Sequence, residues 1–443
     1  MLLRFVVENL FSFKDAAEFN TFPSSKSHSL IHHKMECSHT QALRLAAIYG
    51  ANGAGKSNLL AAMNMLHKAV MSGSLDSWGT DDVLSFRFDP ACSEKTSGMA
   101  IEFYQNGNVY YYHIEFKGRE VVIEELLISK KTKDELVFRR KGKTIEFNGH
   151  LLTKGVNDKF TDALNRLVRT DMLLFSFLGQ YYPSEVENIA EAYSWFSDCF
   201  RVVLPDTISG FVPHFLDKFE EFRQLVNETV PELKTGITEL AVRKNVVTEE
   251  SSKSNGNLAA AFREARNHPE EPQVVESDNG LEISNVVFEG GQVWRKTLVS
   301  IHRDTDGNTV ETPISTESDG TRRLIEYMPL FYAVTRANGV YVVDEIERSI
   351  HPIMIKNIIQ KISASRQASG QLIFTTHESG LLDQRILRPD EIWFAQKDTE
   401  QATKLYPLSD FNIHNTANIE NGYLAGRYGG IPFLSNLKLS LFC

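Results

Sequence analysis

The sequence predicts an α/β fold built on a buried parallel sheet, with an antiparallel β layer beside it. Short apolar segments at residues 43–49, 340–343 and 371–376 are typical of strands buried on both faces. The first is followed by a stretch with helical apolar spacing, which indicates a strand–loop–helix unit. Between residues 85 and 147, alternating segments separated by Gly and Asn turns predict an antiparallel meander of hairpins.

Residues 50–57 read Gly-Ala-Asn-Gly-Ala-Gly-Lys-Ser, the G-x-x-x-x-G-K-S pattern of a phosphate-binding loop. Glycines allow backbone N–H groups to turn toward the phosphates. Lys56 would reach the β- and γ-phosphates, and Ser57 would place its hydroxyl on Mg²⁺. The loop opens a helix predicted over residues 58–66, and a helix N-terminus favours an anion. The residues expected to bind ATP here are Asn52, Gly53, Ala54, Gly55, Lys56 and Ser57.

Two acids follow the apolar segment 340–343. Asp344, at the carboxyl end of the predicted strand, can hold Mg²⁺ through its water shell. Glu345 can orient and polarise an attacking water. The next predicted strand, residues 371–376, leads into His377, which could hydrogen-bond a γ-phosphate. We therefore expect Glu345 and His377 to be catalytic, and Ser57 and Asp344 to bind the metal.

A small polar loop precedes the first acid by about 25 residues. In it, Ser318 could cap a helix that continues through residues 324–334. The N–H groups of the first turn of that helix could meet a phosphate. Ser318, Gly320 and Thr321 are thus further candidates for contact with ATP.

Composition limits the class of protein. The chain has 443 residues, 42% hydrophobic and 23% charged, as in soluble globular proteins of two or three domains. A net charge of −10 gives no overall electrostatic reason to bind nucleic acid, although it does not exclude a local basic patch. Four cysteines without C-x-x-C spacing disfavour a disulfide framework or zinc site and fit a reducing cytoplasm. No apolar run is long enough for a membrane span.

The order of phosphate loop, Ser318 motif, acid pair and histidine resembles that of ABC-type ATPases. Within them the chain is similar to the AAA15 group, relatives of the RecF, SMC and Rad50 heads and of the ATPase half of OLD nucleases. Residues 5–14, His351-Pro352 and the closing segment 423–432 also resemble this group. Ser-Asp-Gly-Thr at 318–321 replaces the Ser-Gly-Gly-Gln of transporters, which argues against a transporter ATPase.

The resemblance implies an ABC-type P-loop ATPase head, with a mixed sheet, the antiparallel meander and a helical insertion. It also implies ATP and Mg²⁺ as ligands. The signature motif of one copy, residues 318–321, would close over ATP held by the P-loop of another. Homo-oligomers built from ATP-sandwich dimers are the expected assembly.

Three regions follow from this reading. Residues 1–150 are expected to form an N-terminal lobe with the P-loop and meander, residues 151–280 a helical insertion, and residues 281–443 a C-terminal lobe with the signature, Walker B acids and switch histidine. Residues 248–279 hold few large apolar residues and are expected to be a mobile segment with one short helix. For that segment a partner-binding role and a plain exposed loop are both open.

Two side-chain assignments belong to this middle part of the chain. Gln180 is a candidate Mg²⁺ ligand by similarity to the glutamine loop of SMC-type relatives, and a plain surface amide is the open alternative. Tyr110 to Tyr112 are expected to be a strand packed into the core rather than a base-stacking platform.

Many ATPases of the resembled group serve prokaryotic anti-phage, abortive-infection systems. The chain is similar in size and architecture to the ATPase subunits of PARIS systems, which implies a cytoplasmic ATPase that controls a separate effector, a Toprim-type nuclease, in response to a phage-encoded trigger. About 65 residues follow His377, too few for a Toprim domain, so a nuclease is expected on another chain. The alternative is a RecF- or SMC-like DNA-repair ATPase that binds DNA in an ATP-dependent, salt-sensitive way.

Overall fold

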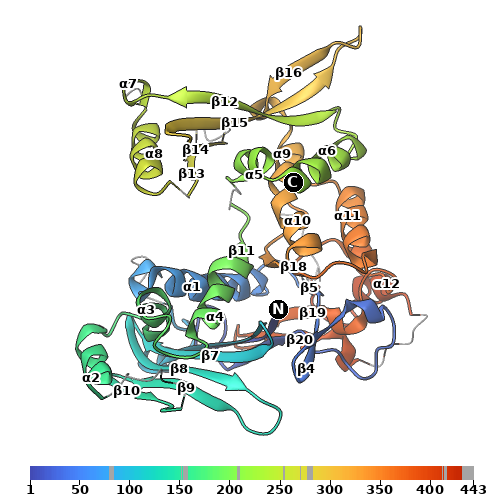
Figure 1. The fold of residues 1–443 in the computed structure, drawn as a ribbon. Helices are drawn as coiled ribbons and strands as arrows, with labels where there is room; N and C mark the ends of the chain where they lie inside the picture. The colour runs from blue at the N-terminus through green and yellow to red at the C-terminus, as the bar shows by residue number, and fades with distance from the viewer. Residues whose placement is uncertain are drawn as a thin grey trace, which may run out of the picture. The chain divides into compact units, whose positions relative to one another are not determined.

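The computed structural model (Figure 1) describes residues 1–78, 84–150, 152, 158–206, 210–252, 255–269, 271–276, 283–411, 413 and 417–431. The chain divides into two compact units, each built from separate stretches of sequence. One comprises Met1–Pro205, Val334–Ile346 and Ile358–Cys443, and the other Asp206–Ala333 and Glu347–Asn357. Within the described ranges, no helix combines the length and apolar character needed to span a membrane.

A six-stranded mixed sheet forms the centre of the first unit, in the order β11-β17-β18-β5-β19-β20. All neighbouring pairs are parallel except β19 and β20, which are antiparallel. Every residue of β5 and β18 is buried, which explains their continuous apolar sequences. The strands are β5 (Leu45–Tyr49), β11 (Phe200–Val203), β17 (Val340–Val343), β18 (Gln371–Thr375), β19 (Ile392–Lys397) and β20 (Thr403–Pro407).

The antiparallel meander forms a second sheet of the same unit, in the order β10-β9-β8-β7-β6-β1-β2. The predicted α/β class with an antiparallel layer is therefore confirmed. Tyr110 and Tyr112 are buried in this sheet, as expected of core residues, while Tyr111 between them is half-buried. The strands are β1 (Leu2–Glu8), β2 (Ala17–Asn20), β6 (Ser97–Gln105), β7 (Asn108–Lys117), β8 (Glu120–Ser129), β9 (Glu135–Lys141) and β10 (Thr144–Phe147).

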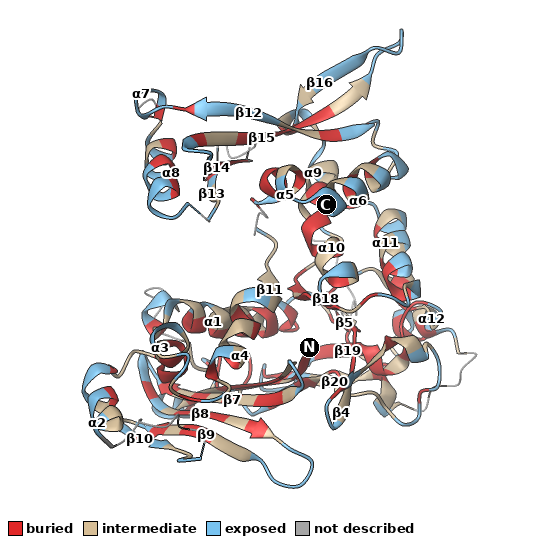
Figure 2. Cartoon of the chain, in the orientation of Figure 1, coloured by how far each residue is buried: buried red, intermediate tan, exposed pale blue. Residues whose placement is uncertain are grey.

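One hydrophobic core joins both sheets to α1 (Lys56–Ser72), the helix that follows the P-loop. Figure 2 shows α1 and the meander strands in a mixture of buried and intermediate colours, as expected of elements with one face in the core. A buried amide ties the sheets together at one edge: Gln371 donates to the carbonyl oxygens of Leu2 and Leu43 at 3.0 and 2.8 Å and accepts the Leu2 N–H at 2.7 Å. Each of these buried polar groups is paired, so hydrogen bonds at the junction offset the cost of desolvation.

The remaining helices of the first unit cover the meander and the sheet edges. The buried Glu124 of β8 accepts the N–H groups of Leu174 and Phe175, both at 2.8 Å, and so fixes the start of α3. Arg140 lies 3.7 Å from the same carboxylate and donates to the Met172 carbonyl oxygen at 2.6 Å. The remaining elements that lie wholly in this unit are α2 (Asp158–Leu167), α3 (Leu174–Tyr181), α4 (Ile189–Ser194), α12 (Ile419–Leu424) and the hairpin β3 (Lys34–Cys37) with β4 (Thr40–Leu43).

The second unit contains a five-stranded antiparallel sheet in the order β12-β15-β14-β13, with β16 paired to β15. The region 151–280, predicted as a helical insertion, thus contains the strands β12 and β13 beside its helices. Charged residues in the middle of β12 mask its alternation in the sequence, yet they pair in register with β15. The strands are β12 (Glu239–Val247), β13 (Gln273–Glu276), β14 (Ile283–Glu289), β15 (Gln292–Arg303) and β16 (Thr309–Pro313).

The described part of residues 248–279 holds more regular structure than the one short helix expected there. Asn255 caps α8 by accepting the N–H groups of Asn257 and Leu258 at 2.9 and 3.1 Å, and Leu258 and Phe262 pack into a core with the sheet. The helices of this unit are α5 (Val212–Lys218), α6 (Glu220–Glu232), α7 (Glu249–Ser252), α8 (Gly256–Asn267) and α9 (Asp319–Glu326). Two helices, α10 (Met328–Arg336) and α11 (Pro352–Ala364), contribute residues to both units.

A half-buried histidine makes the stability of the P-loop helix depend on pH. His67 of α1 donates from Nε2 to the Phe196 carbonyl oxygen at 3.1 Å, and burial lowers its pKa to about 4. Because the unfolded chain binds this proton more readily, the stabilisation is complete above pH 6.5 and is lost as the pH falls toward 4. We predict that the unfolding free energy drops by about 2 kcal/mol more between pH 7.5 and 5 in the wild type than in His67→Gln.

Urea denaturation at the two pH values measures this difference. Glutamine keeps an amide donor for the Phe196 carbonyl group but does not titrate. Equal losses in both proteins would show that other groups cause the pH dependence.

Candidate nucleotide site

Parallel register brings three of the predicted motifs to one edge of the central sheet. Val342 of β17 pairs with Ile373 of β18, which pairs with Ala46 of β5. Because the three strands are parallel, their carboxyl ends lie at the same edge. The acid pair follows β17, His377 follows β18, and the P-loop follows β5. With strands about 4.8 Å apart, the acid pair and the P-loop begin on strands about 10 Å apart.

Two P-loop glycines adopt backbone conformations that other residues disfavour. Gly53 and Gly55 have φ values of 76° and 104°. A Cβ at Gly55 would also collide with the Thr403 hydroxyl, and one at Gly50 would lie 2.6 Å from the Ala395 carbonyl oxygen. Because Gly55 is the N-cap of α1 and has no side chain, the first-turn N–H groups of α1 lack a side-chain cap. They are suited to an anion.

Lys56 lies over the loop that it follows. Its Nζ donates to the Gly50 carbonyl oxygen at 2.7 Å and to that of Ala51 at 3.3 Å, and the side chain is buried. An ammonium group with three donors can exchange such bonds for phosphate oxygens. By contrast Asn52 and Ser57 are exposed.

Segments from both ends of the chain support the P-loop. The buried Thr403 of β20 donates to the Ala54 carbonyl oxygen at 2.9 Å and shares a hydrogen bond of 2.8 Å with the Ser12 hydroxyl. A Cβ at Gly430 would lie 3.7 Å from the Gly50 Cα, so the closing segment approaches the loop as well. The sequence pattern singled out the opening and closing segments but not Thr403. Pro432, the end of the closing pattern, lies outside the described residues.

The two acids after β17 are held by the neighbouring strand. Asp344 is buried, with 2% of its surface exposed, and its Oδ1 accepts the Thr375 hydroxyl at 2.5 Å. Glu345 has φ 50°, in the left-handed region, and its N–H donates to the same Thr375 oxygen at 2.8 Å. Thr375 was not identified from the sequence. His377, two residues beyond it, is exposed.

The signature motif is built as a helix cap and lies in the second unit. Ser318 accepts the Thr321 N–H at 3.2 Å and shares a hydrogen bond of 2.9 Å with the Thr321 hydroxyl. A Cβ at Gly320 would lie 2.5 Å from the Ser349 carbonyl oxygen, so only glycine allows this close approach. The predicted C-terminal lobe is therefore divided: the signature belongs to the second unit, while Asp344, Glu345 and His377 belong to the first.

Gln180 does not lie near the P-loop, so its assignment as an Mg²⁺ ligand is corrected. Its amide donates to the Met71 carbonyl oxygen at 3.2 Å and to the Tyr193 hydroxyl at 2.9 Å. Met71 lies at the end of α1 opposite to Ser57, about 21 Å away along the helix. The open alternative, a surface amide, describes this exposed residue.

The residues at the sheet edge fit the coordination habits of Mg²⁺. This ion is usually held by one or two protein groups together with substrate phosphates and water. Asp344 offers a carboxylate with one oxygen fixed by Thr375, and Ser57 offers an exposed hydroxyl. Among the residues that the structure describes, no group of three or more His, Cys, Asp or Glu side chains could hold a metal.

Fold and site together define a P-loop protein built to bind a nucleotide. The chain belongs to the family described as "AAA domain, putative AbiEii toxin, Type IV TA system", whose model matches residues 45–155 and 203–383, well over half of the length. The first matched range begins with β5 and the P-loop, and the second extends past His377. No curated protein matches the chain.

Solved structures with similar folds include heads of SMC proteins. An Smc head bound to the C-terminal winged-helix domain of ScpA shares 14% identity over 92% of this chain and 97% of that chain, with a TM-score of 0.43. The SMC head domain from Thermotoga maritima shares 13% identity over 93% of this chain and 99% of that chain, with a TM-score of 0.35. An Smc head domain with an extended coiled coil, bound to the C-terminal domain of ScpA derived from Pyrococcus furiosus, shares 14% identity over 92% of this chain and 96% of that chain. Its TM-score is 0.39.

Proposed function

We propose that this chain hydrolyses ATP in composite sites shared by two copies and thereby controls a separate effector of an anti-phage, abortive-infection system. One observation supports ATP hydrolysis: the P-loop, Asp344, Glu345 and His377 follow strands that end at the same edge of a parallel sheet. Catalysis of phosphoryl transfer depends on positioning and electrostatics, which this edge can supply.

Each residue has a distinct part in the proposed reaction. The P-loop N–H groups and Lys56 bind the phosphates. Ser57 and Asp344 hold Mg²⁺, which would neutralise charge that builds on the β- and γ-phosphate oxygens. Glu345 orients the water that attacks the γ-phosphorus, and His377 hydrogen-bonds the γ-phosphate.

The second copy completes the site in this proposal. Ser318, Gly320 and Thr321 form the exposed or half-exposed first turn of α9, where backbone N–H groups suit a phosphate. Closure over ATP bound by another copy would give ATP-sandwich dimers and larger homo-oligomers built from them. ATP then joins the copies and hydrolysis releases them.

The regulatory role rests on the family and on the resemblance to defence ATPases. The family description names a toxin and a toxin–antitoxin system, a setting in which one protein controls a harmful activity. We assign that activity to a separate chain, a Toprim-type nuclease if the system is of the PARIS type, released in the cytoplasm by a phage-encoded trigger.

Mixing two inactive variants tests the composite site. Lys56→Ala removes the phosphate-binding ammonium, and Ser318→Arg blocks the first turn of α9, so each variant alone should hydrolyse almost no ATP. In a mixed dimer one site combines the intact P-loop of one copy with the intact signature of the other. We predict that an equal mixture recovers a substantial fraction of the wild-type rate in a phosphate-release assay.

Glu345→Gln is the control, because it should bind ATP and dimerise without turnover, and it should not complement Lys56→Ala. An inactive mixture, although both variants are folded, would show that one copy encloses ATP alone.

Transfer of the native gene neighbourhood to a phage-sensitive host tests the regulatory role. We predict a lower phage plating efficiency, restored to the level of an empty vector by Lys56→Ala. The chain without its neighbours should not protect, because the effector is missing. Protection by the chain alone would contradict a separate effector. Sensitivity to DNA damage without any effect on phage would instead favour the DNA-repair alternative.

A further inference from the structure

Thr375, the last residue of β18, holds three consecutive residues of the next strand end. Its hydroxyl donates to Asp344 Oδ1 at 2.5 Å and accepts the Glu345 N–H at 2.8 Å. Its carbonyl oxygen accepts the Ile346 N–H at 3.2 Å. Thr375 itself is fully buried, with 0% of its surface exposed. One residue therefore contacts the proposed metal-binding acid and both sides of the proposed catalytic acid.

The hydrogen bond to Asp344 has a directional effect. A buried carboxylate without a partner is costly, so Asp344 depends on this donor. Fixing Oδ1 also sets the plane of the carboxylate and with it the direction of Oδ2. A metal held through that carboxylate would be misplaced if the plane rotated.

The hydrogen bond to Glu345 constrains its backbone. A residue with a Cβ is rarely stable at φ 50°, because the left-handed conformation brings the Cβ close to the carbonyl oxygen. The bonds from Thr375 to Glu345 and Ile346 clamp the backbone on both sides of that residue. Such over-determined backbone conformations are concentrated at functional sites.

We propose that Thr375 is a positioning residue for ATP hydrolysis, which sets the Asp344 carboxylate and the Glu345 backbone through one hydroxyl. The inference rests on the proposed ATPase function. A valine at this position would keep the β-branched shape required in the strand but would leave both Asp344 and Glu345 without this partner. If the hydroxyl had only a structural role, that change would lower stability and leave the Mg²⁺ dependence of the rate unchanged.

The test compares Thr375→Val with Thr375→Ser. We expect Thr375→Val to lower kcat about 10- to 100-fold and to raise the Mg²⁺ concentration needed for half-maximal rate, because hydrogen bonds to charged groups are strong. Its affinity for a non-hydrolysable ATP analogue should stay near that of the wild type. Thr375→Ser keeps the hydroxyl and should retain the wild-type kcat and Mg²⁺ dependence.

Each outcome separates this inference from the ATPase proposal. If the wild type hydrolyses no ATP, the proposed function fails. If the wild type is active and Thr375→Val matches it in rate and Mg²⁺ dependence, the inference alone fails. Should Thr375→Val not fold, Thr375→Cys decides the question, since a thiol is a weak donor and should give an intermediate rate. A wild-type rate in Thr375→Cys would then overturn the inference.

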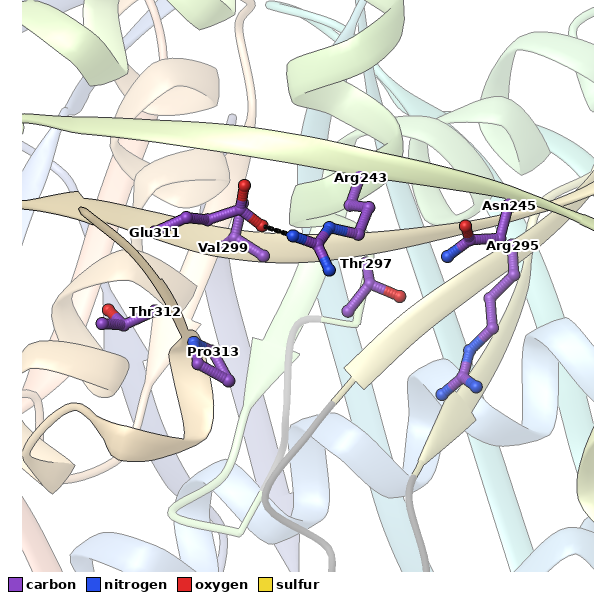
Figure 3. Close-up of a pocket in the computed structure, with 8 residues that line it drawn as sticks. All are labelled: Arg243, Asn245, Arg295, Thr297, Val299, Glu311, Thr312 and Pro313. Carbon is purple, nitrogen blue, oxygen red and sulfur yellow. Dashed lines mark ion pairs between the residues drawn. The ribbon is translucent and has the colours of Figure 1, made fainter. Parts of the chain in front are cut away.

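A separate observation concerns a groove of about 300 Å³ on the sheet of the second unit (Figure 3). Arg243 of β12 pairs in register with Thr297 of β15, and Asn245 with Arg295, so all four share one face of the sheet. Val299 is a buried residue of the groove. The lining residues are Arg243, Asn245, Arg295, Thr297, Val299, Glu311, Thr312 and Pro313.

The groove carries two guanidinium groups and one carboxylate in a chain of net charge −10. Arg295 donates from Nε to the Ser284 hydroxyl at 2.9 Å, which fixes its orientation. Arg243 pairs with Glu311 at 2.5 Å, drawn as a dashed line in Figure 3. That pair demonstrates that the groove fits a carboxylate against a guanidinium. Because both side chains are exposed, the pair is weak and exchangeable.

The chemistry favours an acidic protein segment over nucleic acid. The lining residues include no aromatic ring on which bases could stack. Glu311 would repel a phosphodiester backbone, whereas a flexible peptide can place its carboxylates to either side. The geometry points to a docking site for an acidic segment of a partner protein: one carboxylate replaces Glu311 on Arg243, and a second meets Arg295.

Binding of a fluorescein-labelled poly-glutamate peptide to the full chain tests this site. We expect Arg243→Ala and Arg295→Ala each to weaken binding about 10-fold and Glu311→Gln to strengthen it. Arg303→Ala is the matched control, since Arg303 is exposed on the same strand but does not line the groove. Equal binding by Arg295→Ala and Arg303→Ala would overturn the proposal. So would tighter binding of a single-stranded oligonucleotide of equal charge that depends on the same arginines.

Discussion

The parallel pairing of β17, β18 and β5 is the constraint on which the nucleotide site depends. Because side chains alternate along a strand, a slip of one residue in either pair would turn Asp344 or Thr375 to the opposite face of the sheet. The pairing is secured by burial of these strands, since their apolar side chains have no alternative environment. The positions of Asp344 and Thr375 are thus a consequence of core packing.

The P-loop depends in addition on residues far away in sequence. Ser12 comes from the opening turn and Thr403 from β20, and their shared hydrogen bond lies against the Ala54 carbonyl group. Gly55 has no room for a side chain because Thr403 occupies that space. A loop rich in glycine is flexible by itself, and these contacts limit the conformations that it can adopt.

The sequence predicted those parts of the site that depend on local pattern. The glycine positions of the P-loop and the Ser318 cap follow from neighbouring residues, and the structure builds both. The sequence did not identify Thr375 and Thr403, because each forms hydrogen bonds with residues that are distant in sequence and that only the fold brings close. The assignment of Gln180 was wrong because it relied on order along the chain, while helix α1 separates that residue from the P-loop. Strand β12 was missed because charged residues interrupt its apolar alternation.

The close approach of Gly320 to Ser349 links two motifs mechanically. Ser349 follows Glu345 by four residues, a stretch that spans at most about 14 Å. If the start of α9 and Ser349 move together, the shift reaches this short tether, which begins where Glu345 holds its left-handed conformation. A shift at the start of α9 would then reach the Glu345 backbone through four residues of chain.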